Sequence, residues 1–175
     1  MVSTLNGKIT RGNENDIYSW TSKEDQKFFF DLLKKYKVMI MGSNTYQAAK
    51  KRIRLTKDRL RIVLTKNPKK YSRDTVSGQL EFSSETPPKI VERLGKKRYK
   101  KILIVGGGKV NSSFMNTGLV DELYLTVEPK IFGRGKPLFD EGQFEKAVQL
   151  MYMRKLNKRG TLLLQYKLLK QPNRK

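Results

Sequence analysis

The stretch that decides the predicted fold is residues 102–139, ILIVGGGKVNSSFMNTGLVDELYLTVEPKIFGRGKPLF. It opens with an apolar run at 102–105, which predicts a buried parallel strand. Three glycines follow at 106–108, and residues 109–115 then keep a helical period. A second apolar run, 123–127, comes about one helix later. The stretch therefore predicts a strand–helix–strand unit.

The glycine turn inside this unit is a candidate anion-binding corner. Glycines let the backbone approach a phosphate closely, and the unpaired N–H groups at a helix start favour negative charge. The triplet lacks the GxGxxG spacing of a dinucleotide fold and the GK[ST] ending of a P-loop. Taken alone, it is equally compatible with a plain tight turn.

Composition limits the chemistry that the chain can perform. The 175 residues suit one domain, residues 1–175. Cysteine is absent, which excludes disulfides, thiol nucleophiles and thiolate metal sites. Histidine is absent too, so we expect no metal and assign catalysis to carboxylates, hydroxyls, lysines or a cofactor. No apolar run reaches the ~20 residues of a bilayer span and no signal peptide follows Met1, which predicts a cytoplasmic protein without membrane attachment.

The formal net charge of +22 is extreme for this length. Lys and Arg cluster at 50–54, 96–101 and 154–159. Such clusters can bind nucleic acid by neutralising phosphates, but no RNA- or DNA-binding motif accompanies them. The favoured interpretation is a solvated cationic surface, with nucleic acid not an expected partner. The same charge would attract anionic ligands such as dinucleotides.

A helix is predicted over residues 23–36. Thr21 and Ser22 are N-cap candidates, and Thr21 with Glu24 has the spacing of a capping box. Asp25 falls on the apolar stripe of this helix, where an ionised carboxylate is costly unless something pairs with it. Asp25 is therefore either a binding residue or only a cap of the helix start. The stripe itself consists of Phe28, Phe29, Leu32, Leu33 and Tyr36.

The remaining elements complete an α/β pattern. Strands are predicted at 2–10, 37–41, 60–64, 150–156 and 161–169, and a helix at 89–94. The last two strands flank a turn and form a hairpin. Residues 11–19 and 66–79 are predicted to be polar loops. The fold class is thus α/β, with a mostly parallel central sheet, flanking helices and a C-terminal antiparallel hairpin.

In this order the motifs resemble the dihydrofolate reductase superfamily, which includes the reductases of riboflavin biosynthesis. The resemblance spans about Leu5 to Leu168 and rests on WTSKEDQKFF, MGSNTY, IVGGGKVN and DELYLT. It implies the dihydrofolate-reductase-like fold and an NADPH-dependent reductase of dihydrofolate. In that reaction hydride passes from nicotinamide C4 to pterin C6 while N5 takes a proton.

The resemblance also implies roles for individual residues. Asp25 would bind the pterin N3 and 2-amino group, and Thr126 would bond to the same edge. Burial of Asp25 should raise the pKa of its carboxyl group. Phe29 would pack on the ring system and Arg59 would hold the glutamyl carboxylate. The catalytic set is Trp20, Asp25 and Thr126, and the substrate set is Leu5, Phe29 and Arg59.

The cofactor implied by the resemblance is NADPH. Ser43 stands where the family has an arginine for the 2′-phosphate, so the preference between NADPH and NADH stays open, and Lys66 is a partial replacement. The family's Gly-Gly pair carries a cis peptide, for which Gly106 and Gly107 are the candidates. The cofactor set is Gly42, Ser43, Asn44, Thr45, Thr65, Lys66, Gly106, Gly107, Gly108, Lys109 and Val110.

Two alternatives remain beside dihydrofolate reduction. The first is a riboflavin-pathway reductase acting on a ribosylaminopyrimidine phosphate, favoured by the triple glycine, the NGK turn near the N-terminus and the GRGKPLF segment. Arg61 matches an arginine of such members, but Arg59 matches one of dihydrofolate reductases, so this pair does not decide. Val105 and Thr65 argue against it, because such members usually have Glu and Asp there. The second is an inactive member of the fold that binds nucleic acid through its basic face. A monomer and a homodimer are both compatible with the sequence.

Overall fold

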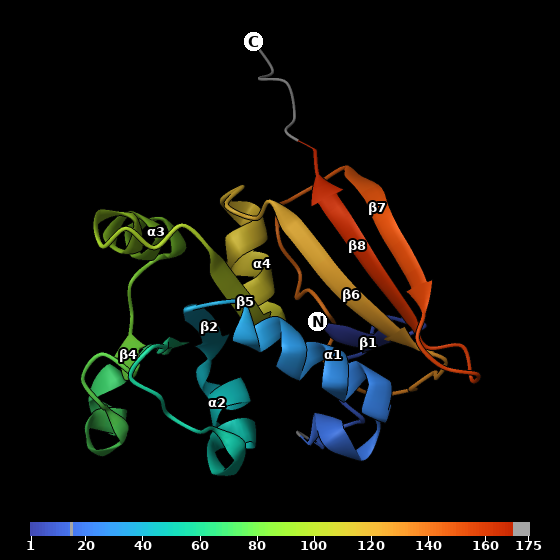
Figure 1. Ribbon diagram of the computed structural model, residues 1–175, viewed down its shortest axis with the longest axis horizontal. Coiled ribbons are helices and arrows are strands. Elements are labelled where there is room, and N and C mark those ends of the chain that lie inside the picture. The colour runs from blue at the N-terminus through green and yellow to red at the C-terminus, as the bar shows by residue number, and fades with distance from the viewer. Residues whose placement is uncertain (15, 170–175) are drawn as a thin grey trace.

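Two four-stranded sheets form the framework of the computed structural model, which describes residues 1–14 and 16–169 (Figure 1). The first sheet is parallel throughout, in the order β4 (Leu80–Ser83), β3 (Leu60–Leu64), β2 (Val38–Gly42) and β5 (Ile102–Gly106). The second has the order β1 (Val2–Thr4), β6 (Glu122–Glu128), β8 (Leu162–Leu168) and β7 (Val148–Lys155). In it β1 and β6 run parallel, and the other neighbours are antiparallel.

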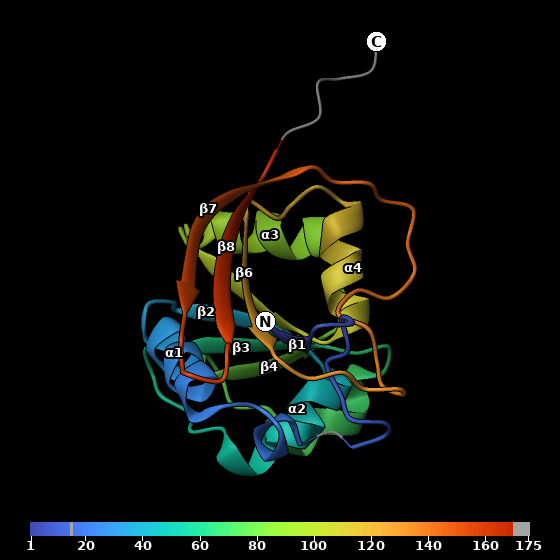
Figure 2. The ribbon, with the colours of Figure 1, turned by 90° about the vertical axis from the view of Figure 1, so that its right-hand side faces the viewer.

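In the described part of the chain, four α-helices and three short 3-10 segments surround the sheets. The helices are α1 (Lys23–Lys34), α2 (Ser43–Ala49), α3 (Pro87–Lys96) and α4 (Gly108–Asn116). The 3-10 segments are η1 (Ile17–Ser19), η2 (Lys50–Arg52) and η3 (Pro68–Asp74). Both ribbon views show α3 and α2 on opposite sides of the parallel sheet (Figures 1 and 2). This α/β architecture with a C-terminal hairpin is the predicted fold class.

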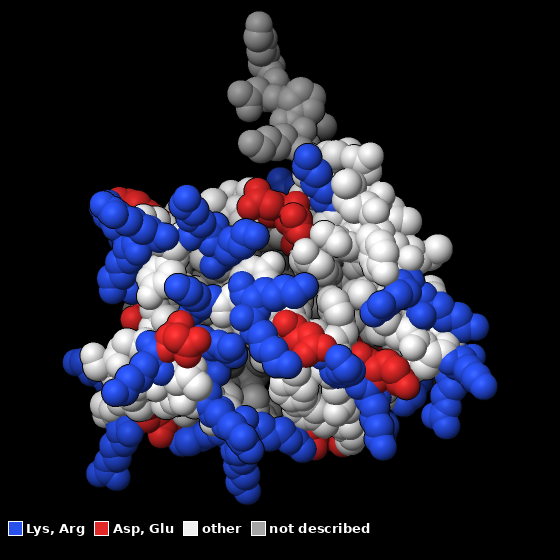
Figure 3. Space-filling view, in the orientation of Figure 1, with Lys and Arg blue, Asp and Glu red and all other residues white. Residues whose placement is uncertain are grey.

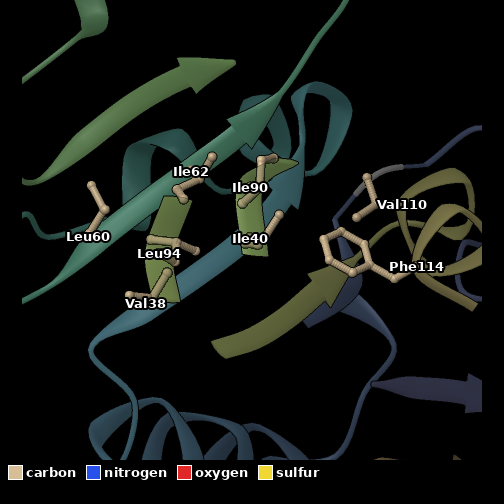
Figure 4. Close-up of a cluster of buried hydrophobic side chains, with 8 residues drawn as sticks. All are labelled: Val38, Ile40, Leu60, Ile62, Ile90, Leu94, Val110 and Phe114. Atoms are coloured by element: carbon tan, nitrogen blue, oxygen red, sulfur yellow. The ribbon is translucent and has the colours of Figure 1, made fainter. Parts of the chain in front are cut away.

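The parallel sheet is buried on both sides, which explains its nearly continuous apolar strands. On one side Ile40 and Ile62 are fully buried against Ile90 and Leu94 of α3, and Phe114 of α4 joins them (Figure 4). On the other side the buried cluster is Met41, Tyr46, Val63 and Leu80, with Tyr71 and Phe82 packed against it. Successive residues of a strand therefore point into the cores on opposite sides of the sheet.

The structure corrects three details of the predicted arrangement. The sheet is divided in two rather than continuous. The strands at either end of the 102–139 unit, β5 and β6, lie in different sheets, and β6 instead pairs with β1 through Val2 and Thr126. Strand β4 was not predicted, because a four-residue strand after a polar loop is too short to establish a period of two.

Candidate active site

A cavity of about 1270 Å³ lies at the C-terminal ends of the parallel strands. Its lining includes the residues that end or follow those strands: Gly42, Leu64, Thr65, Ser83, Val105 and Gly107. Ligands of open α/β sheets bind in this crevice, because the loops and helix N-termini converge there. The volume exceeds that of a typical drug-sized site and can hold a dinucleotide with a second small molecule.

Asp25 is the buried carboxyl group of this cavity. It lies in the first turn of α1 and is only 5% exposed. Burial raises its pKa to about 6, while a hydrogen bond from the Thr126 hydroxyl and the nearby ammonium group of Met1 oppose the rise. The negative charge of Glu128 adds to it. Near neutral pH Asp25 is thus an ionised acceptor that titrates close to the working range of an enzyme.

The start of α1 shows that Asp25 does not serve merely as a cap. Ser22 is the N-cap, and its hydroxyl accepts the Asp25 backbone N–H at 3.2 Å. In a capping box the carboxylate at the position of Asp25 would take the Ser22 backbone N–H in return. Here that N–H donates to Glu128 Oε1 at 2.7 Å, so the carboxylate of Asp25 remains directed at the cavity. The predicted Thr21–Glu24 box was wrong, because Ser22 is the N-cap and its own N–H is bound by Glu128.

Glu128 is the second buried carboxylate beside α1, and it is 3% exposed. Its Oε2 accepts the Thr161 hydroxyl at 2.8 Å, so both oxygens are satisfied. Thr126 and Glu128 are two residues apart on β6 and therefore face the same side of the sheet. Strand β6 thus supports both Asp25 and the N-terminus of its helix, a role that the sequence analysis missed.

The two helix N-termini at the cavity lie close to each other. A Cβ on Gly42, the N-cap of α2, would lie 3.1 Å from Val110 Cγ2 of α4. A Cβ on Gly107, the N-cap of α4, would lie 3.4 Å from Thr45 Oγ1. Backbone N–H groups of both helices therefore face one narrow space, which suits a diphosphate. The peptide between Gly106 and Gly107 is cis, as the resemblance implied.

The adenosine end of such a cofactor would lie near the ends of β3 and β4. Ser43, Thr65 and Lys66 line the cavity there, together with Ser84 and Glu85. Glu85 is held by Arg93, whose Nη2 donates to Glu85 Oε2 at 2.8 Å. Hydroxyl groups and a lysine thus line the region where the family arginine would be expected. The residues present fit a dinucleotide, and they include one cation for a 2′-phosphate.

Residues 136–140 cover the N-terminus of α4 and form a second wall of the cavity. Asn111 Nδ2 donates to Leu138 O at 2.7 Å, and Ser112 Oγ donates to Asp140 O at 2.8 Å. The packing is so close that a Cβ on Gly108 would lie 2.5 Å from Asp140 Oδ1. The GRGKPLF stretch therefore belongs to the site, because it is fixed to α4.

The loop before α1 also lines the cavity, through Asp16, Ile17 and Tyr18. Arg52 Nη1 donates to Asp16 at 3.0 Å, and its guanidinium group lies 4.3 Å from the centre of the Tyr18 ring. This ion pair and cation–π contact tie the loop to η2. The prediction of a polar loop missed this contact, because Arg52 lies 36 residues from Asp16 in the sequence.

Most of the predicted site residues meet at this cavity. Its lining includes Asp25, Phe29, Gly42, Ser43, Asn44, Thr45, Thr65, Lys66, Gly107, Gly108, Lys109, Val110 and Thr126. Gly106 is buried just behind it. These positions agree with the predicted placement, while the roles of the side chains stay predictions.

Three predicted residues do not line the cavity. Trp20 is 2% exposed and packs edge-on against Phe132 at 5.2 Å, so it supports the wall from behind. Leu5 is 62% exposed in the turn after β1. Arg59 precedes β3, whereas the cavity lies at the other end of that strand, and its guanidinium group pairs with Asp58 at 3.6 Å. Neither Leu5 nor Arg59 lines this cavity, and their placement in a substrate site stays a prediction.

Within residues 1–14 and 16–169, no group of three or more acidic, histidine or cysteine side chains is arranged to hold a metal ion. No helix within those ranges combines the length and apolar character needed to cross a bilayer.

A curated relative matches most of this chain, and solved structures share its fold. The chain is 28% identical over 168 residues to the uncharacterized protein YwjB of Bacillus subtilis, covering 86% of this chain and 93% of that protein. A pyrimidine reductase-like protein from Corynebacterium diphtheriae superposes with a TM-score of 0.78 at 19% identity, over 97% of this chain and 90% of that chain.

A second solved structure is longer than this chain. It is a diaminohydroxyphosphoribosylaminopyrimidine deaminase/5-amino-6-(5-phosphoribosylamino)uracil reductase from Thermotoga maritima, with a TM-score of 0.71 at 16% identity. The match covers 96% of this chain and 55% of that one. The departures at Val105 and Thr65 thus do not exclude the riboflavin-type branch. Since the family model of the RibD C-terminal domain matches residues 1–162, the chain belongs to that family, whose fold is dihydrofolate-reductase-like.

Proposed function

We propose that this protein is an NADPH-dependent reductase of an aminopyrimidine ring system, of the riboflavin-pathway type. The observation that carries the proposal is the buried Asp25, paired with Thr126 inside a cavity of dinucleotide size. Membership of the RibD C-terminal domain family supports the reaction class. When bound, NADPH would supply the hydride, and the glycine cradle of α2 and α4 would hold its diphosphate.

The chemistry of Asp25 narrows the substrate. An ionised carboxylate offers two acceptor oxygens and no donor. A 2-amino-4-oxopyrimidine presents a ring N–H beside an amino group, and both can donate to one carboxylate. A uracil ring presents its N–H between two carbonyl oxygens. One carboxylate oxygen would then face a carbonyl oxygen, and two hydrogen-bond acceptors repel each other. We therefore expect a 2-amino-4-oxopyrimidine edge rather than a uracil edge.

The residues of the cavity would act mainly by orientation and electrostatics. Asp25 would anchor the pyrimidine edge, and Thr126 would orient the carboxylate through its hydroxyl group. Phe28 and Phe29 line the same wall and would pack against the ring face. Holding the acceptor carbon beside the nicotinamide converts the transfer into a nearly unimolecular step.

Dihydrofolate is the second candidate substrate. The observation that favours it is the same Asp25–Thr126 pair, because a pterin carries the 2-amino-4-oxopyrimidine edge. The comparisons support the ribosylaminopyrimidine type better than dihydrofolate. Arg59, expected to hold the glutamyl tail, lies away from the cavity. We therefore place dihydrofolate second.

The test is NADPH oxidation, followed by absorbance, with three acceptors in parallel. They are a 2,5-diamino-6-ribosylamino-4-pyrimidinone phosphate, its uracil counterpart and dihydrofolate. We expect turnover with the first to be the fastest, and Asp25→Asn to lower kcat/KM by at least about 100-fold. Asp31→Asn is the matched control, because Asp31 lies on the same helix and pairs only with Lys27 and Lys34 in the residues described. Turnover with none of the three, or an active Asp25→Asn variant, would overturn the proposal.

A further inference from the structure

A second hollow, of about 420 Å³, lies between the later part of α1 and the sheet that contains the C-terminal hairpin. Phe28 and Leu32 line both this hollow and the main cavity, so they form the wall between the two. The volume falls within the range of small-molecule sites, roughly 300 to 1,000 Å³. It is about a third of the volume of the main cavity. The second hollow therefore suits a single nucleotide, whereas the main cavity has room for a dinucleotide.

The floor of the second hollow is a row of side chains across three strands. Register pairs Tyr124 of β6 with Gln165 of β8, and Gln165 with Tyr152 of β7. All three line the hollow, so an amide group lies between two phenol rings. Tyr124 already packs against Phe28, with ring centres 6.3 Å apart. Tyr152 is 45% exposed and contacts no other ring in the described part of the chain, so its ring is available to a planar ligand.

The side-chain amide of Gln165 is held through its nitrogen. Gln165 Nε2 donates to Tyr124 Oη at 3.1 Å and to Glu122 Oε2 at 3.2 Å. Tyr124 Oη in turn donates to Glu122 Oε2 at 2.9 Å. No described residue donates a hydrogen bond to Gln165 Oε1, so this oxygen remains an acceptor that faces the hollow. An amino group on a heteroaromatic ring would satisfy it.

The charged side chains of the lining are all cationic. They are Lys35 at the end of α1, Lys101 just before β5 and Arg154 of β7. None of the three forms an ion pair within residues 1–14 and 16–169. Three like charges from three separate elements repel one another around one hollow, and a bound anion would relieve that repulsion. The charge of the lining therefore favours an anionic ligand.

The surroundings of the second hollow have the same sign of charge. Lys101 ends the basic run at 96–101, in which all five Lys and Arg residues are exposed. Cationic side chains gather over α3 and beside α1, and acidic ones are fewer (Figure 3). Such a field raises the local concentration of anions and speeds their encounter with the hollow. Rings, a free acceptor and cations are thus combined in one small space.

We propose that the second hollow is a binding site for a mononucleotide whose base carries an amino group. The base stacks on Tyr152 and donates its amino group to Gln165 Oε1, and Lys35, Lys101 and Arg154 neutralise the phosphate. Apart from Phe28 and Leu32, the lining residues do not border the main cavity. The proposal is therefore independent of the reductase reaction, and binding alone can test it.

Isothermal titration calorimetry of the full chain with adenosine 5′-monophosphate is the test, in buffer of about 50 mM salt where screening is weak. We expect one saturable site, with adenosine and inorganic phosphate each binding at least about 10-fold more weakly, since each lacks half of the recognised groups. Arg154→Gln should raise the Kd about 5- to 10-fold. Lys155→Gln is the matched control, because it removes the same charge from the adjacent residue on the opposite face of β7. It should leave the Kd within about 2-fold.

A second pair of variants tests the ring. Tyr152→Leu should raise the Kd for the nucleotide at least about 5-fold through lost stacking. Tyr166→Leu makes the same change on the opposite face of β8 from Gln165 and should have little effect. Lys66→Ala, in the main cavity, should leave the affinity unchanged. Circular dichroism of each variant verifies that the fold is retained.

Four outcomes would overturn the proposal. Wild-type protein that takes up no nucleotide has no such site. Affinity that is lost in Lys66→Ala but kept in Arg154→Gln would place the nucleotide in the main cavity. Inorganic phosphate that binds as tightly as the nucleotide would indicate a plain anion site. If Arg154→Gln and Lys155→Gln lowered affinity equally, and a ten-residue oligothymidylate bound with a steep salt dependence, the basic surface would be binding nucleic acid instead.

Discussion

Glu128 accepts the backbone N–H of Ser22 at 2.7 Å, across 106 residues of sequence. This bond joins β6 to the start of α1 and removes the capping task from Asp25, which lies one turn further on. The same carboxylate raises the pKa of Asp25 by its negative charge. Burial is the main cause of the raised pKa of Asp25, and Glu128 adds to it while it also holds the start of the helix that carries Asp25.

Glu128→Gln should move the acid limb of the pH profile of kcat/KM to lower pH. Glutamine keeps an acceptor for the Ser22 N–H but removes the charge, so the pKa of Asp25 should fall. The measurement is the pH dependence of NADPH oxidation from about pH 4.5 to 8. An acid limb that stays in place or moves upward would contradict the electrostatic role of Glu128.

The raised pKa of Asp25 has a consequence for stability. In the unfolded chain this carboxyl titrates near 3.8, and in the folded chain near about 6. Between these values the folded state binds more protons, so the contribution of Asp25 to stability falls as pH rises, by on the order of 3 kcal/mol. Asp25→Asn lacks this titration. Its free energy of unfolding should therefore rise relative to wild type from about pH 4 to 6 and level off above that.

Urea denaturation at several pH values measures that difference, with Asp31→Asn as the control. Lys27 and Lys34 lower the pKa of Asp31 to about 2. The effect of Asp31 on stability therefore has the opposite dependence on pH and falls mostly below about pH 4. The stability of Asp31→Asn relative to wild type should then be nearly constant between about pH 4 and 6. If Asp25→Asn showed the same flat difference, Asp25 would not be desolvated in the folded chain.

The parts of this site that the sequence could predict are those formed by residues close together in the sequence. The strand–glycine–helix corner, the strand before Ser43 and the inward position of Asp25 follow from local periodicity, and the structure has them. The resemblance supplied the cis Gly106–Gly107 peptide. These features are set within about twenty residues of sequence, where helical and strand periods decide.

The missed features depend on partners distant in sequence. Glu128 has no sequence signal as a support for Ser22, because nothing in DELYLTVE indicates a strand lying beneath α1. Arg59 and Leu5 match family positions in the sequence. Whether such residues lie near the cavity is decided only when the sheets assemble. Val105 and Thr65 argued against the riboflavin-type reductases, yet the model of the RibD C-terminal domain matches residues 1–162, because single substitutions report less than collinear motifs.

Cofactor preference should depend on Lys66. It lines the cavity at the end of β3, beside Thr65 and near Ser43, where the family arginine is absent. Lys66→Ala should raise KM for NADPH several-fold and leave KM for NADH nearly unchanged, because only NADPH carries the 2′-phosphate. Ser43→Arg should do the reverse and lower KM for NADPH. Equal changes for both cofactors in Lys66→Ala would place the lysine elsewhere than at the 2′-phosphate.

Gly108→Ala should loosen the wall of residues 136–140 and weaken cofactor binding. The added methyl would lie 2.5 Å from Asp140 Oδ1 and 2.7 Å from Pro137 O, and the backbone oxygen cannot be moved cheaply. We expect a loss of about 1 to 3 kcal/mol in unfolding free energy and a several-fold increase in the Kd for NADPH. Thermal melting and cofactor titration by fluorescence measure the two effects.

Gly95→Ala is the matched helical control, because a Cβ on Gly95 meets nothing within 4 Å. Gly95 lies in α3, away from the residues that line the cavity. Alanine should there raise stability by up to about 1 kcal/mol through helix propensity and leave cofactor affinity unchanged. Comparing the same glycine-to-alanine change at Gly108 and Gly95 separates the effect of packing from the effect of helix propensity. If Gly108→Ala matched Gly95→Ala in both measurements, the contact between residues 136–140 and α4 would not shape the cofactor site.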